Sequence, residues 1–466
     1  MQIETIKKIL DINKEVFLTP KEMASNLVVT FYPTRNKNQN IKDFTEELKK
    51  NFIELGVKVI PFQDSLAKIT LKERLKLKLP FYTKFGKKIK KGIAIIVEGE
   101  SKTNKLAMAK LLSLRENPII TIINEPKEIN ENSTYQEHMN VSLNLFAYHM
   151  TNLAIIVNSS KWAIYSLNGS HPYFSRTDNF KDNVLNELLP KISAPVMPPS
   201  LKDFIIKIGA FNVNDNYYKP FIEDLIKGGA LLEKTGLYPK KRLVSELNFR
   251  NNFYKLIGSK YLDKRNGMSY GFIACQLPTN LEKEVPDVWV LTSKSGSDKS
   301  KLNKNTDIIK VGLVEGKMII ETPLGVDIQE DYKPSFDTRV ILAHAIGNAI
   351  LAKEMKQKKL NWNFWRNLEK NGIAIVHWHG YIRNKNLLGK TLEYGFNNPS
   401  VSCSSAQSAI YALRDKLNCA FKAINDNSEY NCEIHIEPHH GSNIIYESVV
   451  SLANLLLRNN NISKLE

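Results

Sequence analysis

Short apolar runs alternate with amphipathic stretches through the first part of the chain. Strand-like runs occur at residues 27–31, 57–61, 93–97, 119–123 and 153–157. Helical spacing of apolar residues occurs at 41–55, 106–114 and 136–150. Apolar strands separated by amphipathic helices predict a mostly parallel sheet that helices cover on both faces. We therefore predict an α/β layered domain over residues 1–195, ending in a proline-rich linker at 191–203.

The region 204–333 has a mixed pattern. A helical segment from Tyr218 to Lys227 is expected to end at the glycine pair Gly228 and Gly229. Strand-like runs follow at 270–274, 288–291, 308–314 and 318–321. The polar segment 293–305 between them predicts an exposed loop. We expect a mixed α/β middle region.

The region 334–466 predicts a more regular order of elements. The expected elements are a helix at 336–355, a strand at 373–376, a helix at 404–424, a strand at 432–436 and a helix at 444–457. A strand, helix, strand, helix order predicts parallel pairing through right-handed crossovers. The whole chain is thus expected to be an α/β protein of at least two domains, with this β-α-β-α segment at its C-terminal end.

Five of the nine histidines lie in two short runs, HWHG at 377–380 and HIEPHHGSN at 435–443. Each run follows the end of a predicted strand. Because ligands of parallel sheets bind beyond the carboxyl ends of the strands, the two runs are expected to meet in one pocket. The sequence places a candidate site there.

The first interpretation of this site is a metal centre for Zn or Fe. Alternation along a strand puts His377 and His379 on one side, and His435 and Glu437 likewise, and His439 or His440 can complete the set. The alternative is that these histidines end strands and bond to backbone carbonyls.

The second interpretation is a nucleophilic thiol. Cys403 precedes the predicted helix at 404–424, whose dipole lowers a thiol pKa, and a histidine such as His440 can hold the thiolate. The stretch VSCSSAQSAIYAL (401–413) resembles the nucleophile segment of ketosynthases, and EPHHGSN is similar to their catalytic histidine segment. The resemblance covers about twenty residues, and the cysteine lies nearer to the histidine and to the C-terminus than in that fold, so the family is not assigned. The alternative is a small buried residue at a helix start.

The third interpretation is anion capture, which is compatible with either chemistry. Gly441, Ser442 and Asn443 precede the predicted last helix, whose free N–H groups attract anions. The alternative is that Ser442 and Asn443 are ordinary helix caps.

Positive charge exceeds negative charge by 65 residues to 48, a formal net charge of +17. The segment 68–91 holds ten basic residues against the single acid Glu73, with Phe81, Tyr82 and Phe85 among them. Basic side chains bind phosphates and aromatic rings stack on bases, so this segment, with Lys87, Lys88, Lys90 and Lys91, predicts nucleic-acid binding. The alternative is a solvated helix and loop in a lysine-rich protein.

The four cysteines are too sparse for a disulfide framework, and no apolar run is long enough to span a membrane. We expect a cytoplasmic protein with reduced thiols and no membrane partner. The favoured function is an enzyme acting on an anionic, phosphorylated or carboxylated small molecule by hydrolysis or transfer. The alternatives are a Cys403-dependent acyl or group transferase and a non-catalytic nucleic-acid-binding protein.

Overall fold

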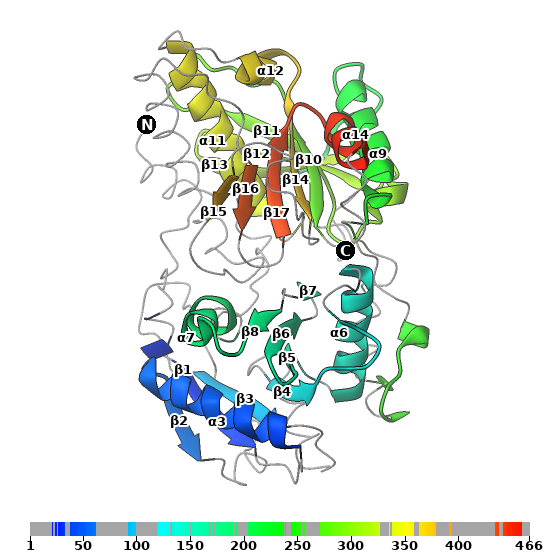
Figure 1. The fold of residues 1–466 in the computed structure, drawn as a ribbon. Coiled ribbons are helices and arrows are strands. Elements are labelled where there is room, and N and C mark those ends of the chain that lie inside the picture. The colour runs from blue at the N-terminus through cyan, green and yellow to red at the C-terminus, as the bar shows by residue number, and fades with distance from the viewer. Residues whose placement is uncertain are drawn as a thin grey trace.

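The computed structural model describes a large part of the chain. The described residues are 21, 24–25, 27–32, 38–61, 92–98, 119–130, 133, 135–149, 151, 153–166, 169–170, 173–189, 192, 204–236, 238, 244–252, 255–256, 271–326, 335, 338–357, 363–378, 391–393, 434–437 and 441–458. They form two mixed sheets with flanking helices, shown toward the bottom and the top of Figure 1.

The first sheet has the strand order β2-β1-β3-β4-β5-β6-β7, with β8 paired to β6. Its parallel strands are β1 Leu27–Tyr32, β2 Lys58–Pro61, β3 Gly92–Glu98, β4 Ile119–Asn124 and β5 Leu153–Val157. Its antiparallel strands are β6 Lys161–Ser166, β7 Gly169–Ser170 and β8 Phe174–Ser175. The five predicted strands and their largely parallel arrangement are confirmed.

Helices cover both faces of the first sheet. Helix α3 (Gln39–Glu54) buries Ile41, Phe44, Leu48 and Phe52, which recur at helical spacing on one stripe, and the Asn38 side chain caps its first turn by accepting from the Ile41 amide at 3.3 Å. The short helical turns α7 (Phe180–Asn183) and η3 (Val184–Leu188) pack in the same core layer. Helix α6 (Tyr135–His149) lies on the other face. The predicted helix at 106–114 and the linker at 191–203 fall largely outside the described residues.

The second sheet has the order β15-β16-β17-β14-β10-β11-β12-β13-β9. Its strands are β9 Ile205–Phe211, β10 Phe272–Gln276, β11 Val288–Ser293, β12 Ile308–Val314, β13 Lys317–Pro323, β14 Ile373–Trp378, β15 Thr391–Glu393, β16 Ile434–Glu437 and β17 Gly441–Tyr446. Only β13–β9 and β15–β16 pair in parallel, so the prediction of a mostly parallel sheet is wrong here. Short hairpins explain this, since β12 and β13 are joined by Glu315 and Gly316, which both have positive φ as a two-residue hairpin turn requires.

The second sheet also has helices on both faces. Helix α11 (Thr338–Gln357) is almost wholly buried against one face, close to its predicted range of 336–355. Helices α9 (Lys219–Glu233) and α14 (Val449–Arg458) pack on the other face (Figure 1). The short helix α12 (Asn363–Lys370) and the turns η5 (Val244–Glu246) and η7 (Lys299–Lys301) complete the described elements. Because β14 pairs with β10, one sheet crosses the boundary predicted between 333 and 334.

Helix α9 does not end at Gly228 and Gly229 as predicted but continues through them to Glu233. A Cβ on Gly228 would overlap the side chain of Val449 in α14, and a Cβ on Gly229 would overlap the carbonyl oxygen of Lys299. The glycines therefore allow neighbouring segments to approach the helix closely, and this close packing outweighs the weak helix propensity of glycine.

The predicted last helix begins later than expected. Residues Gly441–Tyr446 form β17, and α14 starts at Val449. Strand β17 is antiparallel to both β14 and β16 and separates them, so the predicted direct parallel pairing of these two strands is wrong. Strands β16 and β17 are close in the sequence and pair as a hairpin, and Pro438 between them disfavours a helix at that point.

Candidate functional site

The two strands that hold the first histidines of the runs, β14 and β16, end at the same edge of the second sheet. Strands β14 and β16 are each antiparallel to β17, so they point in one direction, and their last residues are Trp378 and Glu437. The sequence also predicts a shared edge, but through direct parallel pairing of the two strands. The strands nevertheless end at one edge, because β17, which lies between them, runs opposite to both.

The register aligns residues from both runs. His377 pairs with Asn443, and Asn443 pairs with His435, so the three occupy one row across neighbouring strands. With strands about 4.8 Å apart, the Cα atoms of His377 and His435 are roughly 10 Å apart. Within the described residues this row is where the two histidine runs come together.

His377 itself is a core residue. It is 2 % exposed, and its ring centroid lies 5.5 Å from that of Phe272, its partner on β10. A metal ion bound by His377 would have to lie inside the packed layers of the protein. This burial favours a structural role for His377.

The other predicted metal ligands are less fully described. His379, His439 and His440 fall outside the described residues, and for His435 and Glu437 only the backbone is described. No group of three or more His, Cys, Asp or Glu suited to a metal occurs among the residues that the structure describes. The Zn or Fe centre stays a prediction.

The amides at the start of the last helix bind a carboxylate of the chain itself. Gly441, Ser442 and Asn443 lie in β17, so their predicted position at the start of the last helix is wrong. At the actual start of α14, the Asp224 carboxylate on α9 accepts hydrogen bonds from the amides of Val449 at 2.8 Å and Val450 at 3.0 Å. Burial raises the pKa of Asp224, and these hydrogen bonds oppose that rise.

The described cysteine is not an activated thiol. Cys275 on β10 is buried, and burial, followed by the nearby charge of Asp224, raises the pKa of its thiol. Cys275 is consequently a protonated core residue at neutral pH. Cys403 falls outside the described residues.

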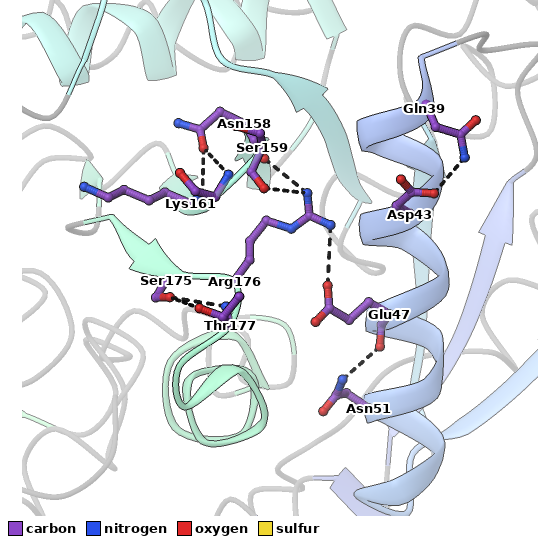
Figure 2. Close-up of polar contacts among 11 residues, drawn as sticks. Gln39, Asp43, Glu47, Asn51, Asn158, Ser159, Lys161, Ser175, Arg176 and Thr177 are labelled. Atoms are coloured by element: carbon purple, nitrogen blue, oxygen red, sulfur yellow. Dashed lines mark hydrogen bonds and ion pairs between the residues drawn. The ribbon is translucent and has the colours of Figure 1, made fainter.

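A polar network at the carboxyl edge of the first sheet was not predicted from the sequence. Arg176, which follows β8, donates to the carbonyl oxygens of Asn158 at 3.2 Å and Ser159 at 3.5 Å (Figure 2). Its other terminal nitrogen lies 3.5 Å from the Glu47 carboxylate on α3, and its guanidinium carbon lies 5.6 Å from the Phe44 ring centroid. The arginine fastens α3 to the turn between β5 and β6.

The turn itself is closed by Asn158. Its side-chain oxygen accepts from the amides of Ser160 at 3.0 Å and Lys161 at 2.7 Å, and its amide donates to Glu125 at 3.0 Å. Glu125 and Asn158 directly follow β4 and β5. The signal that could have found this network is the position of polar residues immediately after two apolar strands.

A lysine is buried on strand β12 of the second sheet, away from the strands that carry the histidine runs. Lys310 on β12 lies 2.8 Å from the Glu321 carboxylate on β13, and both side chains are 9 % exposed. Its ammonium lies 4.1 Å from the centroid of Trp289 and 3.0 Å from the hydroxyl of Tyr218. Lys207 on β9 lies 3.7 Å from the same carboxylate. The Glu321 carboxylate thus forms ion pairs with two ammonium groups.

The α6 interface of the first sheet contains a buried imidazole. The Nδ1 atom of His138 is hydrogen bonded to the Tyr165 hydroxyl on β6. Burial is the largest influence on His138 and lowers its pKa, while the charge of Glu137 opposes this. His138 is therefore neutral at pH 7.

The basic segment 68–91, with Lys87, Lys88, Lys90 and Lys91, falls outside the described residues. The strands on either side of it, β2 and β3, both belong to the first sheet. Comparison with protein-family models and with curated proteins finds no match to the chain. Among the helices that the structure describes, none has both the length and the apolar content needed to cross a bilayer.

Proposed function

We propose that the chain binds single-stranded nucleic acid through the carboxyl edge of the first sheet. The observation that carries this proposal is topological. Strand β1 lies between β2 and β3, so the winding of the sheet reverses at β1, and open sheets bind ligands beyond the carboxyl ends of the strands at such a point.

Two of the connections that leave this edge, those after β1 and β2, are rich in basic residues. The connection after β1 contains Arg35 and Lys37 and leads into α3, whose first turn carries no acidic residue. The connection after β2 contains the segment 68–91, with its ten basic residues and three aromatic rings. Positive charge binds phosphates without regard to sequence, and aromatic rings stack on unpaired bases, so these connections suit a single strand.

The test is fluorescence anisotropy of a labelled single-stranded oligonucleotide of mixed sequence, titrated with the protein at several salt concentrations. Replacing Lys87, Lys88, Lys90 and Lys91 by alanine should weaken binding equally for different sequences. The salt dependence should also become shallower, by about 0.7 in log–log slope for each phosphate that the variant no longer neutralises.

A matched control removes four positive charges elsewhere. The control lysines are exposed and lie on the second sheet or on the helices and turns that flank it: Lys219, Lys234, Lys301 and Lys317. Their replacement should change binding only through net charge. Equal effects of the two quadruple variants would show that binding is a property of total charge. Absence of binding by the parent protein at low salt would refute the proposal.

A second candidate function keeps the histidine runs as a metal-assisted site for an anionic small molecule. It is favoured by the common edge at which β14 and β16 end, because His379 and His439 follow those strands in the sequence. Elemental analysis should then find stoichiometric Zn or Fe that His379→Ala and His435→Ala each abolish and Cys403→Ser retains. If no metal is found, and activity is lost in Cys403→Ser but kept in His379→Ala and His435→Ala, the Cys403 thiol mechanism is supported instead.

A further inference from the structure

Strand β9 is the last strand in the order of the second sheet, and among the described residues it pairs on one side only, with β13. Ile205, Ile206 and Lys207 pair in parallel with residues of β13, and the register shifts before Phe211. Gly209, with φ of +63°, lies in this irregular part. Within the described residues nothing pairs with the outer side of β9. Its outward N–H and C=O groups form a template for one more strand.

The same strand exposes apolar side chains. Ile205 is 44 % exposed, Ile206 is 38 % exposed and Ile208 is 59 % exposed. Leu324, 62 % exposed, lies beside Gly209 and extends the apolar surface. Soluble proteins usually guard a sheet edge with charges, proline or a covering segment. Here the single charged residue of the strand is Lys207.

Positive charge exceeds negative charge near β9, and this excess favours an acidic binding partner. Glu321 is shared by the buried Lys310 at 2.8 Å and by Lys207 at 3.7 Å, and Lys207 is 51 % exposed. A carboxylate approaching β9 from outside would balance Lys207. A second copy of the chain would instead bring another lysine edge and another net charge of +17.

We propose that β9 binds an extended acidic segment of a partner protein, which adds to the second sheet as a further strand. Backbone hydrogen bonds to the outer side of β9 provide affinity, and alternate side chains of the partner provide specificity. Apolar residues of the segment contact Ile206, Ile208 and Leu324, and an acidic residue pairs with Lys207. This interaction surface is separate from the edge of the first sheet proposed to bind nucleic acid.

The experiment is selection of a phage-displayed library of random twelve-residue peptides on the full chain, followed by calorimetric titration of the enriched peptide. We expect enriched peptides to alternate apolar and other residues and to include acidic ones. Ile208→Lys should weaken their binding at least about tenfold, since it places a charge in the apolar contact. Ile53→Lys is the matched control, because Ile53 is a 63 % exposed isoleucine on α3.

A charge exchange tests the register of the contact. Lys207→Glu should weaken the acidic peptide about tenfold, and a peptide with lysine in place of its acidic residue should regain affinity for that variant. Amide exchange should slow in β9 when the peptide binds. Far-UV circular dichroism and thermal unfolding establish that each variant is folded.

Three results would overturn the proposal. They are enrichment no greater than on an unrelated protein, equal loss of binding in Ile208→Lys and Ile53→Lys, and a concentration-dependent dimer that Ile208→Lys abolishes. The last result would assign the edge to a second copy of the chain.

Discussion

The two sheets hold their helices by different means. On the first sheet, polar side chains add links to the helices, as Arg176 does to α3 and as the His138–Tyr165 hydrogen bond does between α6 and β6. On the second sheet, α9 and α14 approach closely through Gly228, and the Lys310–Glu321 ion pair is buried within the sheet surface. A partly exposed polar link can be replaced by water when it is lost, whereas a close backbone contact or a buried charge cannot. We therefore expect substitutions in the second sheet to cost more stability.

The largest effect is expected at the buried ion pair. Glu321→Gln should lower the free energy of unfolding by about 3–5 kcal/mol, because it leaves the Lys310 ammonium buried without its carboxylate. The double variant Lys310→Met, Glu321→Leu should recover most of this loss, since apolar residues need no compensating charge. Urea unfolding of the three proteins measures both effects. A single-variant loss below about 1 kcal/mol would place this pair with surface ion pairs and remove the contrast between the sheets.

The next effect is expected at the close helix contact. Gly228→Ala normally stabilises a helix by about 1 kcal/mol, but here we expect a loss of about 1–3 kcal/mol because the added Cβ overlaps Val449. Adding Val449→Ala should return part of the stability by removing the overlapping methyl groups. A stabilised Gly228→Ala protein in urea unfolding would show that α9 and α14 can separate without penalty.

A smaller effect is expected at the first sheet. Arg176→Ala should cost about 1–2 kcal/mol, since it removes two hydrogen bonds to carbonyls and a partly buried ion pair. Lys181→Ala is the control, because Lys181 also joins α3 through Glu54 at 3.0 Å but both side chains are exposed. The control should cost less than about 1 kcal/mol by thermal or urea unfolding. Equal losses would mean that Arg176 contributes only as a surface charge.

The smallest effect is expected from pH. The pKa of His138 is lower in the folded chain than its ordinary value of 6.5, so the unfolded chain binds the proton more readily. Stability from this residue is complete above about pH 6.5 and declines as the pH falls below that value, by at most about 1.4 kcal/mol per pH unit. Urea unfolding at pH 7.5 and 5.5 should show a steeper decline for the parent than for His138→Gln. Identical declines would locate the pH dependence in other residues.

Local pattern was sufficient wherever a segment's own apolar residues decide its structure. The runs at 27–31 and 153–157 are continuous and rich in β-branched residues, and each forms a strand buried along its length. The spacing of Phe44, Leu48 and Phe52 likewise predicts α3, because one helix face carries all of them. For these elements burial and periodicity agree, so the sequence is unambiguous.

The arrangement of the strands that carry the histidine runs was predicted less well because register and pairing are not local. The two runs could be assigned to strand ends, but not to the row that joins His377, Asn443 and His435, since that row depends on β17 lying between the other strands. The run GSNIIY is short and apolar, and periodicity alone does not distinguish such a strand from a helix start. The network of Arg176 was missed because its partners lie far apart in the sequence.

The sequence by itself therefore determined the α/β class, most of the strands and the positive charge of the chain. Each of these follows from composition or from neighbours along the chain. Only the tertiary structure decided that Gly228 continues a helix, that Asp224 caps α14, and that β9 ends its sheet with apolar side chains exposed. These features depend on which segments meet in space, and that choice minimises the free energy of the whole chain rather than of any one segment.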